Sequence, residues 1–237
     1  MNSDDRIKKP GDRLIIALDL PDAAAALTLA RDLATEVGFF KIGLQLYTAA
    51  GPEVVRAVAG TGAKIFLDLK LHDIPNTVGK AVAAAGDLGI AMLTIHLSGG
   101  RRMIEAAVQA CPQQLLLLGV TVLTSSDEAT LRETGVAAST VQEQVLRLAK
   151  LGCAAGVGGL IASPREVAAL RSCLGEKITI ITPGVRPSWS APEDQKRFTT
   201  PREAVESGAD YLVIGRPVTA HANPREAVQR IIGEIAR

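Results

Sequence analysis

Short apolar runs recur along the whole chain, and each of them is followed by a polar or small residue. We count eight such runs, all rich in Ile, Leu and Val, at residues 14–18, 39–42, 64–69, 91–95, 115–118, 158–161, 178–181 and 211–214. Runs that are short and almost continuously apolar are typical of strands in a parallel sheet, because helices cover both faces of such a sheet. No other feature limits the possible folds of this chain as strongly.

Helical patterns separate most of these runs. Apolar residues recur at helical spacing over residues 22–37, 77–88, 103–110, 140–151, 164–174, 201–207 and 224–236. Several of these segments begin with a proline, which the first turn of a helix tolerates. Eight strands alternating with helices in 237 residues predict an α/β fold, the (β/α)8 or TIM barrel. We expect a single barrel domain over residues 13–237, after a polar N-terminal extension over residues 1–12.

Polar residues stand at the carboxyl ends of the predicted strands, which favours the barrel over an open, doubly wound sheet. Active sites of (β/α)8 enzymes lie at this end of the barrel, where side chains from distant parts of the sequence meet. The residues in question are Asp19, Lys41, Asp68, Lys70, His96, Thr124, Arg186 and Arg216. His96 faces either the pocket or the core, and the sequence leaves both possibilities open.

The third run continues into the segment 68–77, which reads DLKLHDIPNT. A buried strand that ends in charged residues is unusual, because burying a charge is unfavourable unless the charge is paired. Asp68 and Lys70 are two residues apart, so a strand directs both side chains to one side. Asp73 falls beyond the strand, and we expect His72 to face solvent or to bond to the backbone. The group of Lys41, Asp68 and Lys70 is either a device for handling a proton and a negative charge or a structural network of ion pairs.

Two arginines and two glycines favour an anion site after the last two strands. Loops in these positions form a recurring phosphate site in barrels. Gly184 and Gly215 allow close approach of the backbone, and Arg186 and Arg216 add forked donors. The long polar connection over residues 183–201 is typical of a lid.

Composition excludes several classes of protein. The 26 Lys and Arg residues nearly balance the 25 Asp and Glu residues, which argues against a nucleic-acid or membrane-surface binder. No apolar run approaches the ~18 residues of a membrane span, and no secretory signal or metal-binding spacing is evident. Three cysteines without CxxC spacing, Cys111, Cys153 and Cys173, favour a reducing cytoplasm.

Taken together, the motifs resemble those of the orotidine 5'-phosphate decarboxylase family in its bacterial form. The resemblance spans about residues 13 to 225, in family order, and the decapeptide 68–77 is its most specific part. The other motifs that match the family lie at residues 16–19, 40–43, 122–125, 182–187, 194–195 and 213–217. Leu71 stands where the family often has Phe, a difference that we expect to be harmless.

The resemblance implies decarboxylation of orotidine 5'-phosphate to uridine 5'-phosphate in pyrimidine biosynthesis, without cofactor or metal. It implies Lys70 as the proton donor to pyrimidine C6 and Asp68 beside the substrate carboxylate. It also implies a homodimer with shared active sites, in which the partner supplies Asp73, Ile74 and Thr77.

The remaining contacts that the resemblance implies are with the substrate. Lys41 helps to hold Lys70 and, with Asp19, contacts the ribose, while Thr124 lies by the pyrimidine. The phosphate is bound by Arg186, Gln195, Gly215 and Arg216.

Two other functions remain as alternatives. Related barrel enzymes that act on sugar phosphates share the Asp-x-Lys-x-x-Asp core but need Mg²⁺, and they carry an acidic ligand where this chain has Phe66. The second alternative is a barrel that binds a nucleotide without turning it over.

Overall fold

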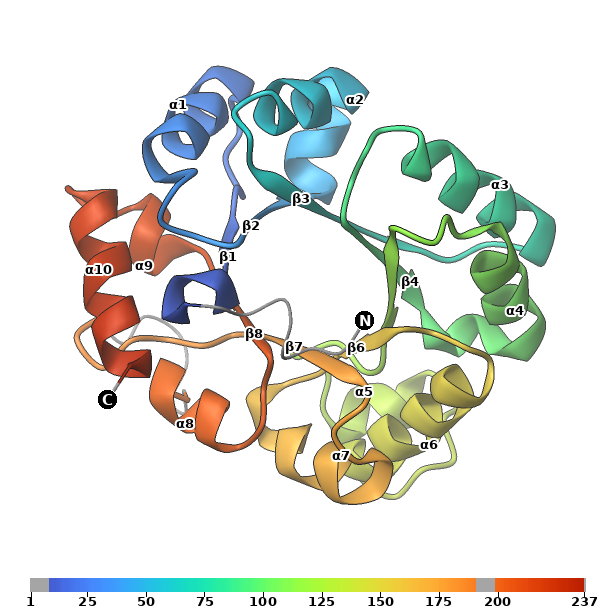
Figure 1. Cartoon of the computed structure of the whole chain (residues 1–237). Helices are drawn as coiled ribbons and strands as arrows, with labels where there is room; N and C mark the ends of the chain where they lie inside the picture. Colours follow the sequence, from blue (N-terminus) through green and yellow to red (C-terminus); the bar gives the residue numbers. More distant parts are fainter. Residues whose placement is uncertain (1–8, 191–198, 237) are drawn as a thin grey trace.

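A computed structural model describes residues 9–190 and 199–236. Within them, eight parallel strands close into a barrel in sequential order, so the predicted (β/α)8 fold is confirmed (Figure 1). The strands are β1 (Leu14–Ala17), β2 (Phe39–Gly43), β3 (Lys64–Leu71), β4 (Met92–His96), β5 (Leu116–Val120), β6 (Gly159–Ile161), β7 (Thr179–Pro183) and β8 (Tyr211–Ile214). The open sheet is excluded because β1 pairs with β8 in parallel.

Helices form a ring around the barrel (Figure 1). They are α1 (Ala23–Leu33), α2 (Leu44–Ala59), α3 (Pro75–Gly86), α4 (Gly100–Ala110), α5 (Glu128–Glu133), α6 (Val141–Ala154), α7 (Val167–Leu174), α8 (Pro201–Glu206), α9 (Arg216–Thr219) and α10 (Pro224–Ile235). Short 3-10 turns precede β1, α4 and α7, at Pro10–Arg13, Leu97–Gly99 and Pro164–Glu166. No helix in the described part of the chain is long and apolar enough to cross a membrane.

The sequence pattern does not predict α2, α5 or α9. In α2, Gly51 takes a left-handed φ of 64° directly before Pro52, so two helical segments meet at a kink. This break interrupts the apolar period on which a helix prediction depends. The other two helices have only six and four residues, too few to establish a period.

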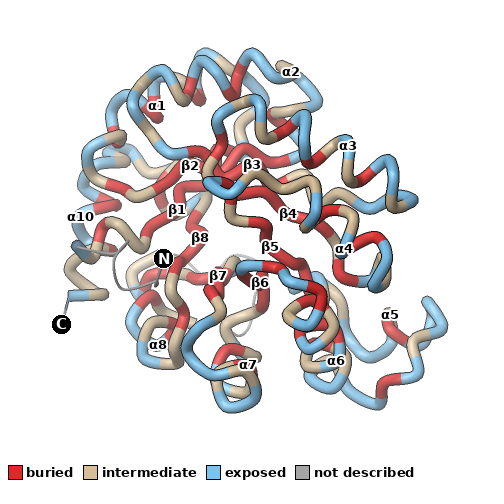
Figure 2. The backbone as a smooth tube through the Cα atoms, turned by 45° about the vertical axis from the view of Figure 1, so that its right-hand side comes forward, coloured by how far each residue is buried: buried red, intermediate tan, exposed pale blue. Residues whose placement is uncertain are grey.

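Two layers of apolar side chains make up the core. The barrel interior contains Ile15, Phe39, Phe66, Leu118 and Tyr211, among others, and the larger layer lies between strands and helices. In Figure 2 the strands are buried along most of their length, while the outer surfaces of the helices are exposed. Since side chains alternate along a strand, a residue two positions after an interior residue also points inward.

The turn Pro10–Arg13 lies at the amino-terminal end of the barrel, where the carbonyl of Gly11 accepts a hydrogen bond from Gly38 N at 3.0 Å. The boundary predicted at residue 12 stays a prediction. At the same end, Arg171 on α7 donates to Asp210 Oδ2 at 2.6 Å and to the carbonyl of Gly208 at 2.9 Å. These structural contacts lie at the amino-terminal end of the barrel, away from the carboxyl ends of the strands, where the sequence predicts the active site.

The Arg171–Asp210 pair should stabilise the barrel without affecting its chemistry. Both side chains are almost buried, at 8% and 14% exposure, so removing Asp210 leaves the buried Arg171 with only the exposed Glu176 as an opposite charge, 3.6 Å away. Asp210→Ala should therefore lower the free energy of unfolding by about 3 kcal/mol or more, as measured by urea denaturation. The control is Arg147→Ala, which removes an exposed helical pair and should change stability little. A loss no larger than that of the control would contradict this role.

Candidate active site

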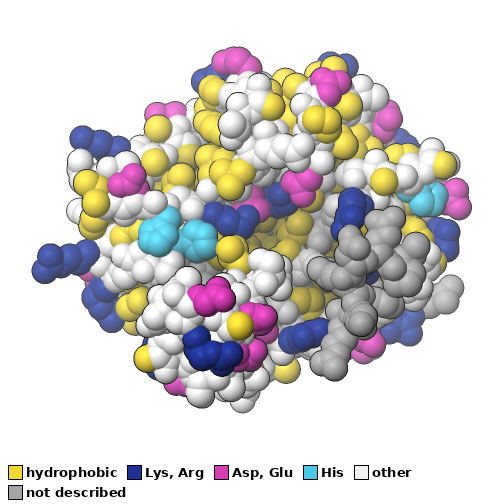
Figure 3. Space-filling view, turned by 180° about the vertical axis from the view of Figure 1, so that it is seen from behind, with side chains coloured by type: hydrophobic (Ala, Val, Ile, Leu, Met, Phe, Trp, Pro, Cys, Tyr) yellow, Lys and Arg dark blue, Asp and Glu magenta, His cyan; other side chains and the backbone are white. Residues whose placement is uncertain are grey.

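Four charged side chains of alternating sign form a row at the carboxyl end of the barrel. Lys41 Nζ lies 2.9 Å from Asp19 Oδ1 and 3.7 Å from Asp68 Oδ2, and Lys70 Nζ lies 2.7 Å from the same Asp68 oxygen. Figure 3 shows acidic and basic side chains within a hollow at the middle of this face. Charges of opposite sign thus lie side by side over the length of the row.

Strands β2 and β3 direct two of these charged side chains into the barrel. Lys41 follows the interior residue Phe39 by two positions, and Asp68 follows Phe66 by two, so both point into the barrel. Only 7% of Lys41 and 8% of Asp68 are exposed. Buried charges of this kind are tolerated because each has an opposite charge and hydrogen bonds. Asp19 lies two residues beyond β1 and is more exposed, as is the Lys70 side chain.

Strand β3 is irregular at Lys70. Lys70 has a φ of 50°, and the pairing of β3 with β4 shifts register between Leu67 and Leu71. The hydroxyl of Thr94, on β4, accepts a hydrogen bond from Lys70 N at 2.9 Å and donates one to Asp68 Oδ1 at 3.0 Å. Sequence reasoning missed Thr94. Its only signal was a polar residue inside an apolar run.

A cavity of about 140 Å³ opens beside the charged row. Its polar lining comes from Lys41, Asp68, Lys70 and Thr124, so Thr124 lies at the same site as the charges. The apolar lining is Phe66, Val120, Val122, Leu123, Ile161, Ala162, Pro183 and Val213. An ammonium group therefore faces a space with largely apolar walls, where electrostatic interactions are stronger than in water.

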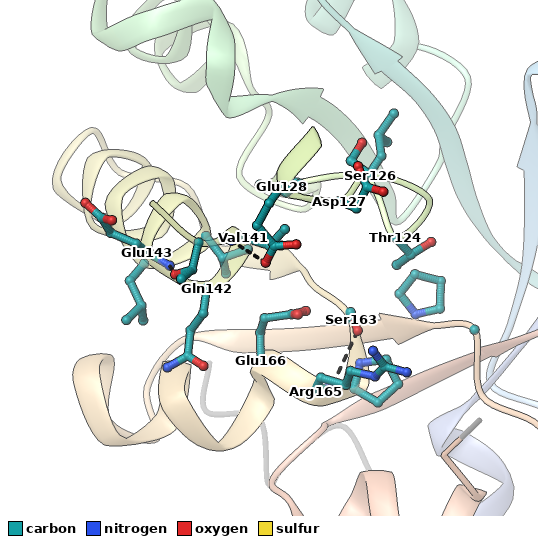
Figure 4. A pocket seen from close by; sticks show the side chains of 18 of the residues that line it. Thr124, Ser126, Asp127, Glu128, Val141, Gln142, Glu143, Ser163, Arg165 and Glu166 are labelled. Atoms are coloured by element: carbon teal, nitrogen blue, oxygen red, sulfur yellow. Dashed lines mark hydrogen bonds between the residues drawn. The ribbon is translucent and has the colours of Figure 1, made fainter. Parts of the chain in front are cut away.

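A larger cavity of about 1070 Å³ adjoins the first and shares Val122, Leu123, Thr124 and Pro183 with it (Figure 4). Two of its carboxylates accept local backbone hydrogen bonds. Asp127 accepts a hydrogen bond from Thr130 N, and Glu143 accepts one from Ser139 N, and these bonds lower the pKa of each carboxyl group. Burial raises the pKa of Glu166. The row of charges distinguishes the smaller cavity as the candidate site of chemistry.

The residues assigned to a partner subunit lie outside this row. Asp73 is exposed and accepts a hydrogen bond from Ile74 N at 2.6 Å, and no ion pair joins it to Lys70 of its own chain within the described residues. Thr77 is exposed in the first turn of α3. Ile74 is 66% exposed, and it is one of the large hydrophobic side chains that lie exposed after strand ends, with Leu44 and Leu123.

The predicted phosphate ligands are only partly described. Gly184 has a φ of 80°, and a side chain there would meet nothing within 4 Å. Arg186 N donates to Thr199 O at 3.0 Å, and Arg216 is exposed at the start of α9. Gln195 lies outside the described residues, so a lid over residues 183–201 stays a prediction.

Two histidines lie at the edge of the site. The rings of His72 and His96 are 5.5 Å apart, and Figure 3 shows two neighbouring histidines beside the hollow. His72 is exposed, as expected. Burial lowers the pKa of His96, and the nearby His72 and Lys70 lower it further, so this ring is neutral at pH 7. His96 is the last residue of β4, which pairs with β3 at Leu71 and Ile95, so it lies near the charged row.

Gly43 provides a test of the charged row that leaves its members unchanged. A Cβ atom at Gly43 would lie 2.8 Å from Lys41 Nζ and 3.1 Å from Asp19 Oδ1, so Gly43→Ala would displace the ammonium. We expect kcat/KM to fall by about tenfold to a hundredfold, because small displacements of catalytic groups are costly. The control is Gly233→Ala on α10, where a side chain meets nothing within 4 Å. Equal activity of the two variants would contradict a functional role for the position of Lys41.

Comparison with known proteins identifies the family. Residues 12–231 match the model of the "Orotidine 5'-phosphate decarboxylase / HUMPS family". The chain is 49% identical over 232 residues to an orotidine 5'-phosphate decarboxylase of Syntrophotalea carbinolica, covering 94% of this chain and 95% of that protein. It is 46% identical over 242 residues to an orotidine 5'-phosphate decarboxylase of a Geobacter species, covering 99% of both.

Solved structures agree with this assignment. The crystal structure of orotidine 5'-phosphate decarboxylase from Lactobacillus acidophilus matches with a TM-score of 0.83 and 36% identity, covering 94% of this chain and 99% of that one. The similarity in sequence and in fold extends over nearly the whole length of each relative. The chain therefore belongs to the orotidine 5'-phosphate decarboxylase / HUMPS family.

Proposed function

We propose that this protein catalyses the decarboxylation of orotidine 5'-phosphate to uridine 5'-phosphate in pyrimidine biosynthesis. The observation that carries the proposal is the Lys70 ammonium, held 2.7 Å from Asp68 at the edge of a small cavity with apolar walls. Family membership and the names of the relatives at 46–49% identity support the same activity. Phe66, which is 1% exposed, stands where sugar-phosphate enzymes on this barrel need an acidic metal ligand.

The proposed chemistry requires a group that meets negative charge at C6 of the pyrimidine. The bond between C6 and the carboxylate carbon breaks, carbon dioxide leaves, and the electron pair remains on C6. An N–H bond of the Lys70 ammonium then breaks and a C6–H bond forms, which leaves a neutral amine that regains its proton from water. A fixed cation stabilises the developing charge without reorganisation, which is the main source of such rate enhancement. The step as proposed uses no cofactor or metal.

The other charges of the row orient this ammonium. Asp68 Oδ2 accepts its hydrogen bond, and Lys41 Nζ lies 3.7 Å from the same oxygen. We assign Asp68 to the neighbourhood of the substrate carboxylate, Lys41 and Asp19 to the ribose, and Thr124 to the pyrimidine. We assign the phosphate, which is remote from the reacting bond, to Arg186, Gln195, Gly215 and Arg216. Binding energy from such a remote group can assemble the site around the reacting atoms.

A homodimer with shared sites is part of the proposal. Asp73, Ile74 and Thr77 lie exposed at the mouth of the barrel, and Ile74 is a large apolar side chain that a partner would cover. A two-fold dimer would bring each chain's Asp73 to the partner's Lys70. The free thiols of Cys111, Cys153 and Cys173 support a cytoplasmic location.

Lys70→Ala should abolish the activity and preserve the fold. The wild-type protein should convert orotidine 5'-phosphate, followed by its ultraviolet absorbance, in the presence of a chelator. Without the ammonium we expect kcat to fall by more than about a thousandfold. Lys64→Ala is the matched control, since Lys64 begins β3 at the opposite end of the barrel.

Three outcomes would contradict this proposal. A folded wild-type protein that binds uridine 5'-phosphate without turnover would be a binding module. Magnesium-dependent activity on a pentulose phosphate, with none on orotidine 5'-phosphate, would indicate a sugar-phosphate enzyme. Substantial activity of Lys70→Ala would exclude this lysine as the proton donor.

Mixing two inactive variants tests whether the subunits share sites. Lys70→Ala and Asp73→Ala should each be inactive alone. In a hybrid dimer, one of the two sites combines an intact Lys70 with an intact Asp73 from the partner, so random reassociation should restore about one quarter of wild-type activity. Native mass spectrometry measures the hybrid fraction. An inactive mixture that contains hybrid dimers would contradict shared sites.

A further inference from the structure

A single buried hydroxyl connects the two central residues of the site. Thr94 is fully buried on β4, with 0% exposure. Its Oγ1 donates a hydrogen bond to Asp68 Oδ1 at 3.0 Å and accepts one from the backbone N–H of Lys70 at 2.9 Å. Both hydrogen-bonding roles of this oxygen toward protein groups are thus taken up by the charged row.

The backbone at Lys70 needs such a partner. Lys70, with a φ of 50°, is the only non-glycine residue with a positive φ among the described residues, and side chains with a Cβ rarely adopt this conformation. The β3–β4 pairing is interrupted here, between Leu67 and Leu71. The hydrogen bond from Lys70 N therefore goes to the Thr94 side chain instead of a carbonyl of β4. Strain of this kind persists only where the surrounding structure holds it.

The Thr94 hydroxyl also decides which partners each oxygen of the Asp68 carboxylate has. Because Thr94 occupies Oδ1, the other oxygen is left to Lys70 at 2.7 Å and Lys41 at 3.7 Å. An unheld carboxylate can rotate about its terminal torsion, which is broad. Rotation of the Asp68 carboxylate would carry the Lys70 ammonium away from its position beside the cavity.

We propose that Thr94 is a positioning residue of the reaction, which fixes the Asp68 carboxylate and the strained Lys70 backbone relative to one another. The inference rests on the proposed decarboxylation. Thr94 is not among the residues that line the cavity, so it would act through these two residues. Valine at this position would keep the shape of the side chain but would neither donate to Asp68 nor accept from Lys70.

The experiment compares Thr94→Val and Thr94→Ser with a matched buried threonine. Thr182 on β7 is also 0% exposed, but its Oγ1 has no hydrogen-bond partner in the described structure, so Thr182→Val removes a hydroxyl without breaking a bond. We expect Thr94→Val to lower kcat by about tenfold to a hundredfold, since the lost hydrogen bond is to a charged group and the geometry loosens. Thr94→Ser should recover most of the rate, and Thr182→Val should behave like the wild type.

Two binding measurements separate positioning from general packing. Calorimetry with uridine 5'-phosphate should give similar affinity for wild type and Thr94→Val, because the product carries no charge at C6. The 6-oxyanion of the same nucleotide places negative charge where the reaction develops it, and its affinity should fall together with kcat. A packing defect would instead weaken both ligands alike.

Wild-type kcat in folded Thr94→Val would overturn the inference, as would an equal loss in Thr94→Ser. If Thr94→Val does not fold, Thr94→Cys replaces it, because a thiol is only a weak donor and its rate should fall between those of serine and valine. Wild-type rate in Thr94→Cys would then overturn the inference. A wild-type protein inactive on orotidine 5'-phosphate contradicts the proposed function itself, whereas an active wild type with an equally active Thr94→Val contradicts only the role of Thr94.

Discussion

The Asp68 carboxylate is the group on which the arrangement of the site depends. It is almost buried, and it receives hydrogen bonds from Lys70 and Thr94 while Lys41 approaches it at 3.7 Å. A buried charge with fewer partners would be strongly destabilising, whereas one with this many is held in a single geometry. The position of the Lys70 ammonium beside the cavity is a consequence of that geometry.

The closed barrel separates stability from chemistry. Alternation along β2 and β3 fills the interior with Phe39 and Phe66 and leaves Lys41 and Asp68 as the next inward-pointing residues toward the carboxyl end. At the opposite end, the buried Arg171–Asp210 pair joins α7 to the start of β8. A site at one end can therefore hold unusual features, such as the positive φ of Lys70, while the rest of the barrel remains regular.

The described chain by itself presents an incomplete version of the proposed site. Asp73 and Ile74 are exposed at the mouth, and no ion pair joins Asp73 to Lys70 within the chain. A second copy of the chain would cover the exposed Ile74 and would bring the neighbouring Asp73 to its own site. The homodimer that we propose is therefore part of the proposed mechanism, because it would complete the site.

The sequence by itself determined the eight strands, their parallel order and the gathering of Asp19, Lys41, Asp68 and Lys70 at one end, because these follow from apolar runs and from a side-chain period of two. It could not reveal α2, whose period is broken at Gly51, nor the shift in register at Lys70. Only the tertiary structure decided that Thr94 meets both Asp68 and Lys70. The reason is physical: a contact between neighbouring strands depends on their register and on a local departure from regular pairing, and neither has a signature in the composition of one strand.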